Sequence, residues 1–117
     1  MNIQQFAEAT GLTAHTLRYY EKIGLLPHIQ RKTSGHRDYS HQDLNWIEFV
    51  KRLKATGMPL VEIQHYAQLR QQGDSTMQQR MVLLQRHAEL LQQRINEETE
   101  HLRNLHQKIL FYREQMD

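Results

Sequence analysis

The sequence predicts a mainly α-helical fold: a winged helix-turn-helix head with a small β-hairpin wing, followed by a long C-terminal coiled-coil helix. Three observations lead to this fold class. Four of the five glycines stand just after short amphipathic segments, where a helix ends in a left-handed residue. A polar, basic stretch separates two pairs of these segments. The last third of the 117 residues carries a seven-residue apolar repeat that no Gly or Pro interrupts.

The first pair of helices carries its own start signals. Residues 3–10 follow Asn2, which can cap the helix, and Gln5 can complete a capping box with it. A second helix, residues 14–23, follows the capping residue Thr13. A glycine ends each helix, and the turn of three to four residues between them has the spacing of a helix-turn-helix.

The second pair of helices is equally well marked. Ser40 and Asp43 form a second capping box, which opens a helix over residues 41–56. Pro59 suits the first position of the next helix, which runs to about residue 70. We therefore expect a head of residues 1–73 that contains four helices.

Two elements of this head are basic. One is the hairpin expected over residues 27–39, with Gly35 in its turn, and the other is the outer face of the helix over residues 14–23. Arginine on a helix in the major groove can pair with guanine edges, and Arg, Lys and Tyr can hold phosphates. Ordinary solvated charge is the alternative, but a Gly turn, a polar helix and a basic hairpin together favour DNA. The side chains concerned are His15, Thr16, Arg18, Tyr19 and Lys22 on the helix, and His28, Arg31, Lys32, His36 and Arg37 in the hairpin.

Residues 74–117 form the second predicted domain, a coiled-coil dimerisation helix. From Met77 to Met116 the gaps between repeat positions alternate four and three, and eleven of the twelve positions are apolar or aromatic. Forty helical residues make a rod of about 60 Å, which needs a partner, most simply a second copy. One long helix lying on its own domain is the alternative. The predicted dimer contacts are Leu84, Ala88, Leu91, Ile95, Leu102, Leu105 and Ile109.

Glu98 is the one charged residue at a repeat position. It can fix the register between two helices at a cost in stability, as buried polar residues do. Alternatively, the apolar seam drifts there and leaves Glu98 in solvent, because a helix does not keep a strict seven-residue period.

Composition excludes several classes of protein. The absence of cysteine excludes disulfides, thiolate metal sites and cysteine nucleophiles. No run approaches 18 apolar residues and no signal peptide is recognisable, so we expect a cytoplasmic protein without membrane contact. The eight histidines show no metal-binding spacing, so we expect no metal and no cofactor. No nucleophile–base pair, phosphate loop or paired carboxylates appear, so we expect no enzymatic activity.

Specific motifs add a family resemblance. The run Arg18-Tyr19-Tyr20-Glu21 within residues 17–27, the stretch Gly35-His36-Arg37-Asp38-Tyr39, and residues 53–60 resemble the signature of the MerR family of transcriptional regulators. The resemblance covers essentially the whole chain. It implies a winged head and a homodimer formed through an antiparallel coiled coil.

The resemblance also implies how such a dimer works. It binds a pseudo-palindromic operator in double-stranded promoter DNA whose spacer is too long. It bends and untwists that spacer so that RNA polymerase can engage both promoter elements. Carried over by position, the recognition-helix residues are Thr13, His15, Thr16, Arg18 and Tyr19, with Lys22 beside them, and the wing residues are Gly35, His36, Arg37 and Tyr39.

The chain departs from the better-known branches at the sensing end. It resembles the short aldehyde- and stress-responsive branch most, yet it has no cysteine, so a thiol-alkylation switch is impossible. The identity of any small-molecule effector is unknown. A pocket for one is a hypothesis, placed between the head helices and the partner's coil and lined by Trp46, Phe49, Tyr66 and Leu69.

Two rival functions remain beside the regulator. An architectural DNA-bending protein would use the same head without an effector switch, but a fixed dimer spacing argues for an operator with two half-sites. One dimer per defined site would support the regulator, and cooperative coating would support the bender. A coiled-coil adaptor would bind DNA no better than any basic protein.

Overall fold

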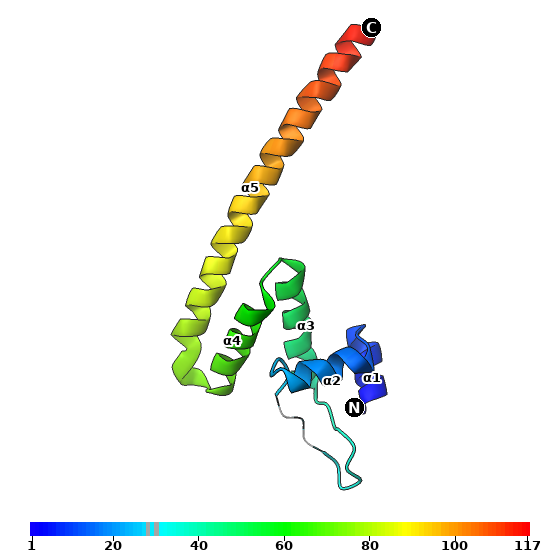
Figure 1. Cartoon of the computed structure of the whole chain (residues 1–117), viewed down its shortest axis with the longest axis vertical. Coiled ribbons are helices and arrows are strands. Elements are labelled where there is room, and N and C mark those ends of the chain that lie inside the picture. Colours follow the sequence, from blue (N-terminus) through cyan, green and yellow to red (C-terminus); the bar gives the residue numbers. More distant parts are fainter. Residues whose placement is uncertain (28, 30) are drawn as a thin grey trace. The chain divides into compact units, whose positions relative to one another are not determined.

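The computed structural model describes residues 1–27, 29 and 31–117. This part of the chain is mostly helical, which confirms the predicted fold class (Figure 1). By internal contacts it divides into a first unit, Met1–Val82, and a second unit, Leu83–Asp117. The functional boundary between residues 73 and 74 stays a prediction. In chain order the elements are α1 (Ile3–Thr10), α2 (Ala14–Lys22), α3 (His41–Ala55), α4 (Leu60–Gln71), the 3₁₀ turn η1 (Asp74–Thr76) and α5 (Met77–Met116).

The predicted capping boxes are present. The Asn2 side chain accepts a hydrogen bond from the Gln5 amide at 2.8 Å, and the Gln5 side chain accepts one from the Asn2 amide at 2.9 Å. Ser40 and Asp43 repeat the arrangement at the start of α3, at 3.1 and 2.9 Å. These bonds satisfy amides that a helix start leaves open, so the local sequence fixes where α1 and α3 begin.

Pro59 lies one position earlier than predicted. Its φ of −59° and ψ of 145° place it just before α4 as the capping residue, and Leu60 is the first helical residue. Helix α4 then runs to Gln71. The difference is one residue and leaves the order of elements unchanged.

Side chains of α3 and α4 hold the end of α2 in place. The Trp46 indole donates a hydrogen bond to the Leu25 carbonyl at 2.6 Å, and Gln64 donates to the Ile23 carbonyl at 3.0 Å. The Lys54 ammonium donates to the Tyr20 hydroxyl at 2.7 Å. These bonds satisfy polar groups where α2 ends, so the second helix pair fixes the position of α2. The core beneath it includes Phe6, Leu17, Ile47, Val50 and Ile63, all fully buried.

The predicted β-hairpin is a looser feature than expected. In the described residues it contains a single antiparallel bridge, Arg31 to Arg37, and no strand. The turn is closed by hydrogen bonds from the Lys32 amide to His36 and from the Gly35 amide to Lys32, both at 2.8 Å. Gly35 has a φ of +85°, which glycine adopts without strain. A polar hairpin with little apolar surface to bury forms few ladder bonds, which explains the missing strands. The predicted residue His28 lies outside the described residues.

Helix α5 runs without interruption from Met77 to Met116, as the repeat predicts. None of its residues is buried. Within the described residues, no helix combines the length and apolar character that crossing a membrane requires.

Candidate nucleic-acid interface

Helix α2 divides cleanly into a buried and an exposed face. Leu17 and Tyr20 are buried, as the spacing predicts for a core face. Thr13 caps the helix by accepting a hydrogen bond from the Thr16 amide at 3.1 Å. The Thr13 hydroxyl also donates to that of Thr16 at 2.9 Å, so the two hydroxyls are held together at the helix start. The exposed predicted side chains are Thr13, His15, Arg18, Tyr19 and Lys22, with Thr16 half-buried.

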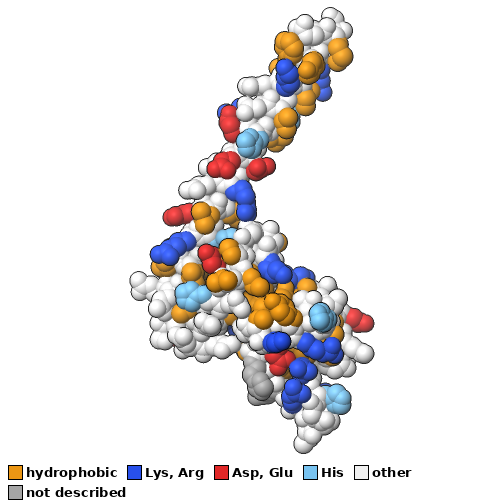
Figure 2. Space-filling model, viewed as in Figure 1, with side chains coloured by type: hydrophobic (Ala, Val, Ile, Leu, Met, Phe, Trp, Pro, Cys, Tyr) orange, Lys and Arg blue, Asp and Glu red, His pale blue; other side chains and the backbone are white. Residues whose placement is uncertain are grey.

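The hairpin brings a second set of cations beside α2. Figure 2 shows Lys and Arg side chains gathered over this part of the first unit. Arg31 donates a hydrogen bond to the Gly35 carbonyl at 3.0 Å, and the His36 ring lies 3.1 Å from the Ser34 hydroxyl. Both contacts orient a hairpin side chain from within the hairpin itself. His36, Lys32 and Arg31 remain exposed to solvent.

An ion pair ties the hairpin to α2. The Arg37 Nε donates to the Glu21 carboxylate at 2.7 Å, with 28% of the Arg37 side chain and 14% of the Glu21 side chain exposed. Arg37 was predicted as a DNA contact, and the structure gives its Nε to this pairing. Its terminal nitrogens carry four further N–H groups that remain available for a phosphate. Sequence reasoning missed Glu21 as a partner, although it is the only carboxylate in α2.

A small basic cleft lies where α1, α2 and the hairpin meet. It has a volume of about 230 Å³. Three guanidinium groups and one imidazole line it, and among the described residues its lining holds no carboxylate, although Glu21 pairs with the Nε of Arg37 beside it. Its charge therefore favours an anion of phosphate size. Arg18 from α2 shares this cleft with the hairpin, and the residues at the start of α1 are an addition. The lining residues are Asn2, Ile3, Arg18, Arg31, Gly35, His36 and Arg37.

Tyr39 is a correction to the predicted wing. It was predicted to contact DNA, but only 2% of its surface is exposed. Its ring stacks on Phe6, with centroids 4.3 Å apart and planes 8° from parallel. Burial raises the pKa of the Tyr39 phenol above its ordinary value, and among the described residues its hydroxyl has no hydrogen-bond partner. Tyr39 therefore anchors the end of the hairpin to α1.

The predicted dimer contacts line one side of α5. Positions spaced alternately by three and four residues share a helix face, because a helix has 3.6 residues per turn. Leu84 and Leu91 are half-buried. The exposed fractions of Ile95, Leu102, Leu105 and Ile109 are 49, 52, 62 and 49%, and Ala88 is also exposed. An exposed apolar stripe of this length, interrupted by Glu98, is typical of a helix that packs against a partner.

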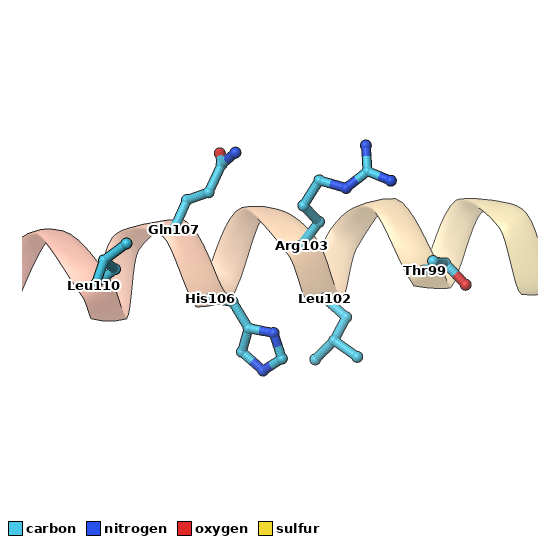
Figure 3. Close-up of a pocket in the computed structure, with 6 residues that line it drawn as sticks. All are labelled: Thr99, Leu102, Arg103, His106, Gln107 and Leu110. Carbon is cyan, nitrogen blue, oxygen red and sulfur yellow. The ribbon is translucent and has the colours of Figure 1, made fainter.

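A groove of about 360 Å³ follows this helix near its end. Figure 3 shows Leu102 and His106 pointing to one side and Arg103 and Gln107 to the other. Residues at spacings of three, four and seven outline the hole that receives a side chain in coiled-coil packing. Two such outlines lie in a row here, but Leu102 is the one predicted dimer contact among the lining residues, so the groove runs beside the predicted seam. The lining residues are Thr99, Leu102, Arg103, His106, Gln107 and Leu110.

Comparison with known proteins decides the family. The model of the MerR helix-turn-helix family of regulatory proteins matches residues 1–69, and a model described as MerR, DNA binding matches residues 44–108. The chain belongs to the MerR family. The family predicted from the motifs of α2 and the hairpin is thereby confirmed, and the chain contains the helix-turn-helix and DNA-binding regions of that family.

Similar proteins span much of this MerR chain. An uncharacterized HTH-type transcriptional regulator of Haemophilus influenzae is 37% identical over 106 residues, which cover 91% of this chain and 78% of that protein. The transcriptional regulator AdhR of Bacillus subtilis is 46% identical over 84 residues, which cover 72% of this chain and 60% of AdhR. The chain thus spans less than two thirds of AdhR. These relatives are transcriptional regulators, which are not enzymes.

Solved structures agree with the fold. A MerR family transcriptional regulator from Listeria monocytogenes superposes with a TM-score of 0.87 at 37% identity, covering 93% of this chain and 83% of that one. HiNmlR, a MerR family regulator that lacks the sensor domain, was solved bound to promoter DNA. It superposes with a TM-score of 0.83 at 34% identity, covering 97% of this chain and 90% of its own.

Proposed function

We propose that this MerR protein binds a pseudo-palindromic promoter operator as a homodimer and switches transcription by distorting the spacer DNA. In this proposal α2 enters the major groove, and the hairpin holds the flanking backbone. The observation that carries it is the basic cleft, in which Arg18 of α2 and Arg31 of the hairpin line one site. In a dimer, each copy that contacts both base edges and flanking phosphates fixes its own orientation on the DNA. The two copies together can therefore bend the DNA that lies between them.

The DNA contacts divide by chemistry. Arg18 and Thr16 lie on α2, where side chains reach base edges and thymine methyl groups. Arg31, His36 and the free end of Arg37 suit the phosphate backbone. Thr13 and Tyr19 bring hydroxyls, and His15 and Lys22 bring further donors on the exposed face. Gly35 keeps the hairpin turn tight, and Tyr39 supports it from the core.

The dimer is proposed to pair two α5 helices in antiparallel orientation. With the two helices fully overlapped, the seven-residue repeat is symmetric about its centre, so every seam position meets another seam position. A shift by one heptad in either direction leaves seam positions at the helix ends without a facing residue. In one direction it also sets Ala88 against Glu98. In the overlapped register the facing pairs are Leu84 with Ile109, Ala88 with Leu105, Leu91 with Leu102, and Ile95 with Glu98.

Engineered cysteines test this register without background, because the chain has none. The double variant Leu91→Cys/Leu102→Cys should form covalent dimers rapidly, whereas each single variant should not. Leu84→Cys/Leu102→Cys reports the heptad-shifted register and serves as the matched control. Cross-linking of Leu91→Cys alone would show a parallel coil and contradict the antiparallel dimer.

The switching mechanism makes a separate prediction about the promoter. In vitro transcription with RNA polymerase would compare the natural promoter with one whose spacer is shortened to the ordinary length. If distortion compensates for a long spacer, the protein should change transcription from the natural promoter and bring no gain on the shortened one. Equal stimulation of both promoters would contradict the proposal. DNA bending without any transcriptional effect would favour the architectural alternative.

A further inference from the structure

A second cleft lies within the first unit, away from the basic cleft. It has a volume of about 540 Å³, which is in the range of small-molecule sites. Its wall is aromatic: the Trp46 and Tyr66 rings stack with centroids 5.8 Å apart, and Phe49 lies 5.7 Å from Tyr66. Three of the four residues in the pocket hypothesis line it, but the fourth, Leu69, is buried in the core.

Two arginines give this aromatic cleft its charge. The Arg70 guanidinium lies 4.4 Å from the centre of the Trp46 ring, in a cation–π contact that leaves its N–H edge open. Arg80 is held by hydrogen bonds to the Thr76 hydroxyl at 3.1 Å and to the Gly73 carbonyl at 3.2 Å. Within the described residues no carboxylate lines the cleft or forms an ion pair with either arginine.

We propose that the aromatic cleft binds a small planar organic anion, of the class of aromatic carboxylates. Both guanidinium groups are half-buried and line one cleft, and no carboxylate among the described residues lines it, so the local charge favours an anion. Arginine recognises a carboxylate with two parallel hydrogen bonds. The ring of such a ligand would pack against the half-buried Phe49, because Trp46 and Tyr66 are only 5 and 9% exposed. The side-chain amides of Gln42 and Asn45 lie in the same lining and can bind a further polar substituent.

The cleft has a direct physical link to the DNA-binding face. Trp46, which lines it, donates its indole N–H to the Leu25 carbonyl. The Leu25 amide in turn donates to the Tyr20 carbonyl at 2.8 Å, at the end of α2. A ligand that moves the Trp46 ring therefore acts on the segment that fixes the recognition helix. This regulatory role rests on the proposed function, whereas binding itself does not.

The binding test uses a reporter that the chain already contains. Trp46 is the single tryptophan of the chain, so a change in its fluorescence reports on the cleft and on the Leu25 contact that the same ring makes. The full chain would be titrated with benzoate, with benzamide as a neutral probe of the same shape and acetate as an anion without a ring. We expect a saturable change with benzoate, with a dissociation constant in about the millimolar range for so small a probe, and none with the other two.

Variants then assign the response to the two arginines. Arg70→Gln and Arg80→Gln should each weaken benzoate binding roughly tenfold or more, because each removes a charged hydrogen-bond donor. Arg52→Gln is the matched control, because Arg52 is an exposed arginine near the end of α3 and does not line the cleft. This variant should bind benzoate as the unsubstituted protein does. Arg70→Lys keeps the positive charge but loses the planar set of N–H donors that a guanidinium group offers a carboxylate. It provides a second test if a glutamine variant fails to fold.

The outcomes separate the cleft from the proposed function. No saturable response to benzoate, or an equal response to benzamide, would overturn the proposal whether or not the chain binds its operator. Sedimentation of Arg70→Gln as a monomer would also overturn it, because the cleft would then be a contact for a second copy. If benzoate binds, operator affinity measured with and without it should differ in the parent and not in Arg70→Gln.

Discussion

The two units of this molecule differ in how far they bury their apolar side chains. In the first unit, Phe6, Leu17 and Ile63 are fully buried by residues of the same chain. In the second unit, Leu105 is 62% exposed and Leu102 52%. Burial of apolar surface is the main force that holds a fold together, so the first unit encodes its own structure. The second unit leaves its apolar stripe exposed, and in the proposed dimer a second copy supplies the burial that the stripe lacks.

The largest effect is expected from breaking the stripe of the second unit. Leu102→Asp should raise the dissociation constant of the dimer by two orders of magnitude or more, because an unpaired buried charge costs about 3–5 kcal/mol. Leu90→Asp is the control, since Leu90 is 61% exposed and lies off the stripe. Sedimentation equilibrium measures both. An intact Leu102→Asp dimer would show that α5 does not carry the association.

A smaller effect is expected on the exposed face of α2. Arg18→Ala should weaken operator binding by about 1–3 kcal/mol and leave the stability of the first unit unchanged. The Arg18 side chain is exposed and lines the basic cleft, so its removal should affect operator affinity and not the packing of the core. Fluorescence anisotropy with labelled operator measures the change, with Arg52→Ala as the control. An unchanged affinity would remove α2 from the interface.

Glu98→Leu distinguishes the two interpretations of the charged seam position. If Glu98 fixes the register against Ile95 of the second copy, leucine should tighten the dimer by about 1 kcal/mol and permit cross-linking in the heptad-shifted register. If the seam drifts and Glu98 lies in solvent, neither the dissociation constant nor the cross-linking pattern should change. Sedimentation and the double-cysteine variants measure these two quantities.

Tyr39→Phe should stabilise the first unit by about 1 kcal/mol, because it removes a buried hydroxyl without a partner. It should also change the pH dependence. Since burial raises the pKa of Tyr39, the folded state keeps the proton at pH values where the unfolded state releases it. The parent should therefore lose stability as the pH rises above the ordinary value of 10.0, and Tyr39→Phe should lose less. Urea unfolding at neutral and alkaline pH tests this, with exposed Tyr19→Phe as the control.

The smallest effect is expected from the ion pair between α2 and the hairpin. Glu21→Gln removes the charge that holds Arg37, and we expect operator affinity to fall by about 1 kcal/mol or less, because the pair is partly exposed. Anisotropy measures the loss. A tighter complex would instead mean that Glu21 keeps Arg37 away from the phosphates.

Local signals predicted more of the molecule than distant contacts did. The caps at Asn2 and Ser40 depend on residues three positions away, and both were predicted. Tyr39 was assigned to the DNA-binding wing from the family resemblance, and its stacking on Phe6 was missed because Phe6 lies far away in sequence and only the fold brings the rings together. The pairing of Arg37 with Glu21 was missed for the same reason. In the aromatic cleft, the three rings were predicted from α3 and α4, but the two arginines were not.

The most direct test of the central claim is binding to the promoter region beside the protein's own gene. Fluorescence anisotropy would follow it across a salt series with excess non-specific DNA as competitor. The proposed function predicts saturation by one dimer per site and binding that survives the competitor. Weak binding that vanishes with salt would show phosphate contacts alone and would contradict a specific regulator.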